Sequence, residues 1–84
     1  MSTPMDIQTR VLRTIAEQFG LGQDRINPAE QLVADFGMDS LDGVELCMAI
    51  EDEFAIEIPD EDAEACKTVQ DVIDLVTKEV GRQS

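Results

Sequence analysis

Ser40 is the residue whose surroundings are best suited to chemistry. It lies in residues 37–43 (GMDSLDG), with one aspartate directly before it and another two positions after it. An apolar pattern at helical spacing begins here, which would place Ser40 in the first turn of a helix. That turn presents unpaired backbone N–H groups and a partial positive charge, so the backbone would favour a phosphate ester on Ser40. The simpler alternative is that Asp39 or Ser40 only caps the helix.

A more specific alternative is that Ser40 is the nucleophile of a serine hydrolase, and the composition argues against it. A nucleophilic serine needs a general base within hydrogen-bonding distance, usually a histidine, and the chain contains no histidine. The only lysines, Lys67 and Lys78, lie near the C-terminal helix, and there is neither a Gly-x-Ser-x-Gly turn nor a glycine-rich oxyanion loop. We therefore expect a protein without catalytic activity.

Two further groups of side chains lack the pattern that a metal site requires. Asp60, Asp62 and Glu64 are spaced as in a calcium loop, but the sixth position, which requires glycine, is alanine. Cys47 and Cys66 lie nineteen positions apart without a Cys-x-x-Cys pair. We expect no dedicated metal site and two buried free thiols, and a disulfide between them stays open.

Negative charge is concentrated in the middle of the chain. The formal net charge is −13, and residues 26–66 contain thirteen acidic and no basic residues, while six acidic and six basic residues elsewhere cancel. Because the acids alternate with apolar residues and 43% of the chain is hydrophobic, we expect a folded acidic surface and not a disordered tail. Such a surface would repel nucleic acids and anionic membranes and attract proteins with basic patches.

The length and hydropathy indicate one small domain over residues 1–84. The N-terminus has no basic stretch followed by an apolar run, so no secretory signal is predicted. No window approaches the ~20 apolar residues that span a bilayer. We expect a cytoplasmic monomer that does not insert into membranes.

The first element is predicted to be a helix that ends at Gly20. Thr3 offers a capping hydroxyl, Pro4 suits the first helical position, and Asp6 stands three residues after the cap. Gly20 can adopt the left-handed conformation that stops a helix. The apolar residues at helical spacing are Ile7, Val11, Leu12, Ile15 and Phe19.

A long connection over residues 22–38 is predicted next, with one short turn capped by Asn27. We expect Leu32, Val33 and Phe36 to hold it against the core.

The second helix is predicted to begin at Asp39 or Ser40 and to run to about Phe54. Leu46, Ile50 and Phe54 recur every four residues and are expected to face the core. Residues 55–58 alternate like a strand, but Pro59 follows and no partner strand exists, so we expect a loop.

A short acidic helix is predicted from Pro59 to about Ala65, followed by a last helix that Thr68 caps, with Asp71 in the capping box, and that Gly81 ends. The apolar face of the last helix comprises Val69, Val72, Ile73, Val76 and Val80. Three main helices and one short third helix predict an all-α fold, a small four-helix bundle with a long loop between helices one and two.

The order of these motifs resembles the type II acyl carrier protein family. The matching segments are residues 39–42 (DSLD), 44–46 (VEL), 48–54 (MAIEDEF), 58–64 (IPDEDAE) and 68–70 (TVQ). The resemblance runs without a break from about Leu32 to Val76. A bare Asp-Ser-Leu would be weak, but here the serine motif, the acidic helix and the proline-acidic turn occur in order.

The resemblance implies that Ser40 receives 4′-phosphopantetheine from coenzyme A through a phosphodiester, and that the terminal thiol of this arm holds an acyl group as a thioester. It also implies a phosphopantetheinyl transferase as a partner. Further implied partners are acyl transferases, ketoacyl synthases, reductases and dehydratases with basic docking patches. Fatty acid biosynthesis is the pathway that we expect.

The resemblance further implies a docking surface around Ser40, with five acids that meet basic patches and three apolar residues beside the arm. Its members are Asp39, Leu41, Asp42, Val44, Glu45, Met48, Glu51 and Asp52. The alternatives are a solvated face for the acids and ordinary core for the apolar residues.

Two other interpretations stay open. One is a carrier dedicated to a polyketide, lipid A or another specialised acyl product. The other is an unmodified acidic interaction module, which would need the acidic surface but not Ser40.

Overall fold

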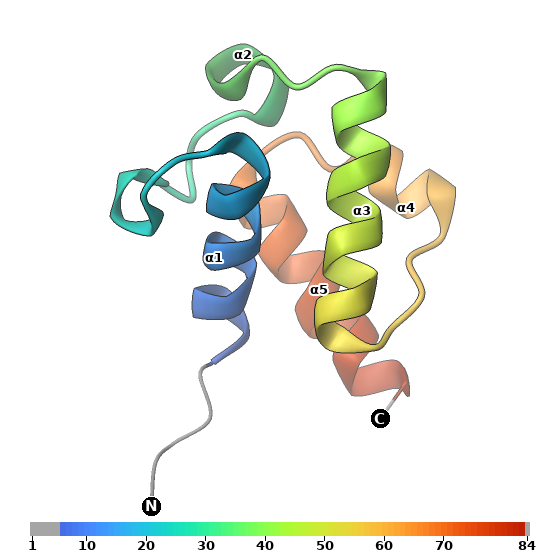
Figure 1. Ribbon diagram of the computed structural model, residues 1–84. Helices are drawn as coiled ribbons and strands as arrows, with labels where there is room; N and C mark the ends of the chain where they lie inside the picture. The colour runs from blue at the N-terminus through green and yellow to red at the C-terminus, as the bar shows by residue number, and fades with distance from the viewer. Residues whose placement is uncertain (1–5, 84) are drawn as a thin grey trace, which may run out of the picture.

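A computed structural model describes residues 6–83, and within them it shows helices and no strand. The elements are α1 (Ile7–Phe19), the 3₁₀ turn η1 (Gln23–Arg25), α2 (Leu32–Phe36), α3 (Ser40–Phe54), α4 (Asp60–Ala65) and α5 (Val69–Gln83). Figure 1 shows α1, α3 and α5 as the long members of the bundle, with α2 at one end and α4 beside α3. The predicted all-α fold, with three main helices and a short helix after the second, is confirmed.

The start of α1 differs from the prediction. The N-cap is Asp6, whose Oδ1 accepts a hydrogen bond of 2.7 Å from the backbone N–H of Thr9, so Asp6 is not the third residue after the cap. This bond also lowers the pKa of the Asp6 carboxyl. The predicted cap at Thr3 and Pro4 lies outside the described residues. Gly20 ends the helix in the left-handed conformation, with φ 69°, as predicted.

The connection between α1 and α3 contains more helix than the sequence predicted. Besides the turn at Asn27, whose Oδ1 accepts from the N–H of Ala29, it contains η1 and α2. Leu32 is buried, and the ring of Phe36 stacks on that of Phe19 at 5.4 Å between centroids. The prediction for Val33 is wrong, because this side chain is 65% exposed. Leu32 and Phe36 are four residues apart and share the one buried face of this short helix, whereas Val33 follows Leu32 directly and points away from that face.

The buried core joins α1, α3 and α5 with the first residue of α2 and with the intervening loops. Its members are Val11, Ile15, Ala16, Ile26, Leu32, Leu46, Ile50, Ile56, Ile58, Val69, Val72, Ile73 and Val76. Leu46 and Ile50 are buried, as predicted, and Phe54 is only half-buried. The guanidinium of Arg10 lies 4.3 Å from the ring centroid of Phe54, which explains how this ring meets the core with one face only.

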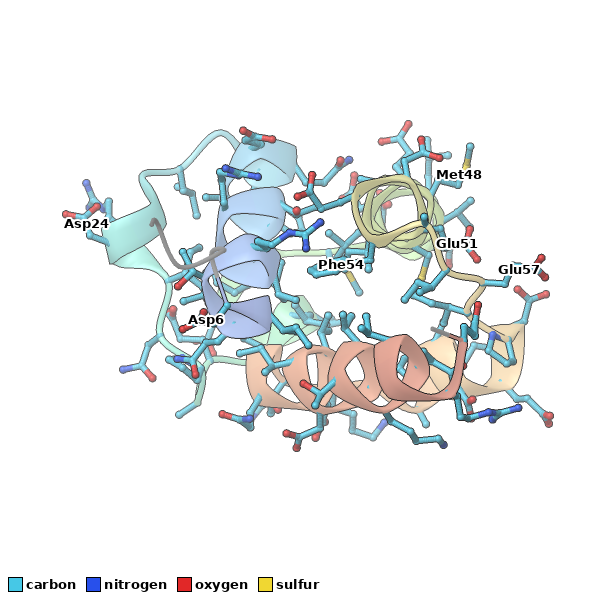
Figure 2. All side chains as sticks on the ribbon, turned by 90° about the horizontal axis from the view of Figure 1, so that it is seen from below. Asp6, Asp24, Met48, Glu51, Phe54 and Glu57 are labelled. Atoms are coloured by element: carbon cyan, nitrogen blue, oxygen red, sulfur yellow. The ribbon has the colours of Figure 1, made fainter. Side chains whose placement is uncertain are left out.

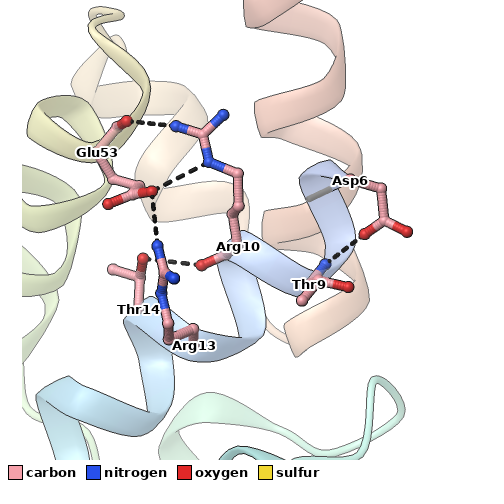
Figure 3. A network of polar contacts seen from close by, with 6 residues as sticks. All are labelled: Asp6, Thr9, Arg10, Arg13, Thr14 and Glu53. Atoms are coloured by element: carbon pink, nitrogen blue, oxygen red, sulfur yellow. Dashed lines mark hydrogen bonds and ion pairs between the residues drawn. The ribbon is translucent and has the colours of Figure 1, made fainter. Parts of the chain in front are cut away.

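Arg10 and Arg13 of α1 converge on Glu53 in the last turn of α3 (Figure 3). Arg10 Nε and Arg13 Nη2 lie 3.0 and 3.1 Å from Glu53 Oε2, and Arg10 Nη2 donates a bond of 2.7 Å to the Glu53 carbonyl oxygen. Cations are favoured at this end of a helix, where the backbone carbonyls are unpaired. The cluster therefore fixes the end of α3 against α1.

The C-terminal helix extends beyond its predicted end. The capping box at its start is confirmed: Asp71 Oδ2 accepts from the N–H of Thr68, and Thr68 Oγ1 accepts from the N–H of Asp71. α5 passes through Gly81 to Gln83, however. Gln83 exchanges two hydrogen bonds, of 3.0 and 2.9 Å, with the backbone of Glu57. These bonds hold the last turn and offset the low helix propensity of glycine.

Candidate functional site

Ser40 is the first residue of α3, and its side chain is exposed. The cap is its neighbour Asp39, whose Oδ1 accepts from the N–H of Asp42 at 2.8 Å, while Asp42 Oδ2 accepts from the N–H of Asp39 at 3.3 Å. This reciprocal capping box uses both aspartates. The Ser40 hydroxyl is therefore not needed to cap the helix and is available to a reagent from solvent.

The short loop before Ser40 has a fixed conformation. Gly37 ends α2 with φ 68°, in the left-handed region that favours glycine. The N–H of Met38 then donates a hydrogen bond of 3.2 Å to the carbonyl oxygen of Leu32. Because Leu32 is buried, this bond ties the approach to Ser40 to the core.

A groove of about 860 Å³ opens beside Ser40 and runs between α3 on one side and α4 with the start of α5 on the other. Buried apolar side chains form its floor, and polar, charged and exposed apolar residues form its rim. The lining residues are Gln31, Leu32, Val33, Met38, Asp39, Ser40, Gly43, Val44, Leu46, Cys47, Met48, Ile50, Glu51, Ile58, Asp60, Ala63, Glu64, Cys66, Lys67, Val72 and Leu75. An arm attached to Ser40 could therefore place an apolar chain over this floor without crossing the bundle.

Gly43 leaves space in the groove wall one turn after Ser40. A Cβ at this position would meet only the terminal methyl of Met38, at 3.6 Å. The flexible Met38 side chain thus covers the glycine at the mouth of the groove.

Cys47 and Cys66 both line the groove, and both are free thiols, as predicted. They are half-buried and not fully buried. Burial, followed by the negative charge of Asp71, raises the pKa of Cys66 to about 11. Burial likewise raises the pKa of Cys47, with a smaller effect from Glu51. Both side chains are therefore protonated, weakly nucleophilic thiols at neutral pH.

The three apolar residues of the predicted docking surface are exposed on α3, and two of them, Val44 and Met48, also line the groove. Leu41 is 65% exposed, Val44 57% and Met48 58%, so they are not ordinary core. Figure 2 shows Met48 on the outer side of α3 and Phe54 turned toward the interior. Such exposed apolar side chains on one helix are typical of a surface that a partner covers.

The five acids of the predicted surface divide into two groups. Asp39, Glu45 and Asp52 are exposed, although Asp39 also caps α3 and Glu45 accepts a bond from Gln18. Asp42 and Glu51 are half-buried. The carboxylate of Asp42 belongs to the capping box, and that of Glu51 accepts from the N–H of Ile58 at 2.8 Å. Glu51 therefore also fixes the α3–α4 loop.

Lys67 is a groove residue that sequence reasoning missed. It follows residues 26–66, which contain no basic residue, and it lines the same groove as Ser40. Its position as the first cation after the acidic segment was a signal in the sequence. The pairing of residues 30–32 with 67–69, which brings it there, is a contact between distant parts of the chain.

Within residues 6–83, no group of three or more histidine, cysteine, aspartate or glutamate side chains is arranged to hold a metal ion. No helix of that part of the chain is both long and apolar enough to cross a membrane.

Comparison with protein families gives a match over most of the chain. A family model described as "Phosphopantetheine attachment site" matches residues 9–76, from α1 to the middle of α5 and including Ser40. The chain belongs to this phosphopantetheine-binding (PP-binding) family. It is a carrier that bears covalently attached 4′-phosphopantetheine, as expected of an acyl carrier protein. Family membership also implies interaction with a phosphopantetheinyl transferase and with acyl-processing enzymes.

Proposed function

We propose that Ser40 is the attachment residue and that the protein carries the acyl intermediates of fatty acid biosynthesis, without performing chemistry itself. The observation that supports this most is the position of Ser40: exposed, not used for capping, and at the mouth of an apolar-floored groove. The attached group supplies a terminal thiol that holds an acyl chain as a thioester.

The start of α3 suits the anionic phosphodiester that attachment creates. The N–H groups of Ser40 and Leu41 precede the first intrahelical bond of α3, so they have no acceptor within the helix. They and the helix dipole favour the negative charge of a phosphodiester attached to the Ser40 oxygen. The carboxylates of Asp39 and Asp42 oppose it, but each is held by a backbone N–H.

We propose that partner enzymes dock on the outside of α3, next to the arm. The proposed surface consists of Asp39, Leu41, Asp42, Val44, Glu45, Met48, Glu51 and Asp52. Its three exposed apolar side chains supply contact area, and its acids attract basic patches on the transferase, acyl transferases, ketoacyl synthases, reductases and dehydratases. Because rim charges act mainly on the rate of encounter and are screened by salt, binding is weak and release is fast. This is what a carrier that visits several enzymes needs.

The attachment test is the mass of the intact protein before and after incubation with coenzyme A and a broad-specificity phosphopantetheinyl transferase. Wild-type protein should gain one phosphopantetheine and Ser40→Ala none. Ser84→Ala, which removes a serine elsewhere in the chain, should gain the group like wild type. No mass increase in folded wild-type protein would favour the unmodified acidic interaction module, and an increase in Ser40→Ala would place the attachment elsewhere.

The pathway is tested by identifying the acyl groups on protein purified from its native cells. Saturated and 3-hydroxy chains of graded length are expected for fatty acid synthesis. A single unusual acyl group would favour a carrier dedicated to a polyketide, lipid A or another specialised product.

A further inference from the structure

Lys67 supplies the only positive charge on the described wall of the groove beside Ser40. The other charged residues of this wall are all acidic: Asp39, Glu51, Asp60 and Glu64. Lys67 is exposed, and its ammonium forms no ion pair within 4.0 Å in the described part of the chain. Its electrostatic partner is Asp71, whose pKa is lowered mainly by the backbone N–H groups of Lys67 and Thr68 and to a smaller extent by the Lys67 charge. A single unpaired cation in an acidic groove is available to an anion that enters it.

The backbone of Lys67 is held from both sides, so its side chain extends from a fixed point. Its N–H donates a hydrogen bond of 2.9 Å to Asp71 Oδ2, and its carbonyl oxygen accepts a hydrogen bond of 2.9 Å from the N–H of Leu32. The carbonyl oxygen of Leu32 in turn accepts from the N–H of Met38 at 3.2 Å. Two successive peptide hydrogen bonds therefore connect Lys67 to the loop that ends at Ser40.

The remaining cations of the described chain are occupied or lie outside the groove. Arg10 and Arg13 are bound to Glu53 at the other end of α3. Arg82 is paired with Glu79 at the end of α5. Neither Arg25 nor Lys78 lines the groove.

We propose that Lys67 is a positioning residue for the arm: its ammonium holds the anionic phosphodiester on Ser40 and seats the arm at the mouth of the groove. This inference rests on the proposed attachment at Ser40. Attachment adds a negative charge between Asp39 and Asp42, and the acidic wall by itself would drive that charge out toward solvent. The ammonium of Lys67 places a positive charge at one point of this acidic wall. The arm then lies along the apolar floor, and because the pair is exposed, salt releases it.

The experiment compares ¹H–¹⁵N and ³¹P NMR spectra of the apo and holo forms of wild type, Lys67→Met, Lys67→Arg and Lys78→Met. Mass spectrometry establishes loading in each case. In wild type at low salt, loading should shift the amide signals of residues 66–68, far from Ser40 in sequence. Lys67→Met should lose these shifts and change the ³¹P shift, although it still gains the full mass. Lys67→Arg should retain them, and Lys78→Met, which removes a charge outside the groove, should behave like wild type.

A salt titration of wild-type holo protein gives a second readout that needs no variant. Raising the NaCl concentration should move the ³¹P and amide signals toward the values of Lys67→Met, so the proposal stays testable if that variant does not fold. Loaded Lys67→Met with the amide shifts of wild type, or wild-type shifts that do not respond to salt, would overturn the role of Lys67 and leave attachment at Ser40 intact. Failure of wild type to gain mass would overturn both.

Discussion

At the scale of single residues, the first turn of α3 divides two tasks between neighbours. Asp39 caps the helix through the N–H of Asp42, which leaves the exposed Ser40 hydroxyl free for the proposed modification. If Ser40 were the cap, a bulky ester on its oxygen would remove that capping bond. Asp39, directly before the serine, thus has a structural role as the N-cap of α3 that does not depend on any partner protein.

Replacing Asp39 with alanine should therefore destabilise the protein. Loss of an N-cap costs about 1 kcal/mol, because the N–H of Asp42 loses its acceptor; the second bond of the capping box, from the backbone N–H of residue 39 to Asp42 Oδ2, does not use the Asp39 side chain and is retained. Asp52→Ala, which removes the same charge from an exposed position of the same helix, is the control. Urea unfolding should give a lower free energy for Asp39→Ala than for Asp52→Ala. Equal values would show that the capping box contributes nothing beyond its charge.

The raised pKa of Cys66 predicts slow alkylation of this thiol. With the pKa at about 11 instead of the ordinary 9.0, the reactive thiolate at pH 8 is about 100-fold rarer. In Cys47→Ser, where Cys66 is the only thiol, the folded protein should react with iodoacetamide far more slowly than the same protein in urea. The rate should still rise between pH 9 and 11. A rate that levels off near pH 9 would contradict the shift.

At the scale of elements, α1 and α3 are joined by polar contacts as well as by the core. Arg10 and Arg13 bring two cations to the carboxylate and carbonyl end of α3 (Figure 3). These side chains are 28–38% exposed, so solvent screens the ion pairs but does not remove them. The bridge holds one end of α3 while its other end, with Ser40, meets the loop from α2.

Glu53→Gln should weaken this junction. Two ion pairs are lost, for which we expect a loss of about 1 kcal/mol after screening. Glu61→Gln, on the exposed face of α4, removes the same charge without an ion pair among the described residues. Thermal unfolding should show a lower midpoint for Glu53→Gln and an unchanged or higher one for Glu61→Gln. A raised midpoint in both variants would mean that net charge outweighs the bridge.

At the scale of the whole molecule, the net charge of −13 opposes folding. Thirteen acids in residues 26–66 are brought together by the fold, and only three ion pairs form within residues 6–83. Self-repulsion of this kind destabilises the compact state while it keeps the protein soluble and attractive to basic partners. The same charge therefore limits stability and, under the proposed function, serves docking.

Salt should consequently act in opposite directions on stability and on docking. Between about 10 and 300 mM NaCl, where the screening length falls from roughly 30 Å toward several ångströms, the thermal midpoint of the apo protein should rise by a few degrees. Over the same range, the rate at which the transferase modifies Ser40 should fall. A double variant, Glu61→Gln with Glu64→Gln, should show a smaller rise. A midpoint that falls with salt would show that attractive pairs dominate.

Local signals in the sequence determined much of this protein. The capping patterns at Asp39 and Thr68, the left-handed stop at Gly20 and the apolar periodicity of Leu46 and Ile50 predicted three long helices close to their observed bounds. Each of these signals acts within a few residues of its cause. The serine motif and the order of acidic segments likewise indicated the family before any contact was visible.

Tertiary structure alone decided the features that depend on distant segments. Val33 has the same apolar character as Leu32, and only the packing of α2 turns one inward and the other outward. α5 continues past Gly81 because Gln83 meets the backbone of Glu57. Lys67 reaches the groove through its pairing with Leu32. Such contacts join residues that are far apart along the chain, and no periodic pattern in the sequence marks them. Local patterns therefore predict the helices, whereas the fold decides which residues lie beside Ser40.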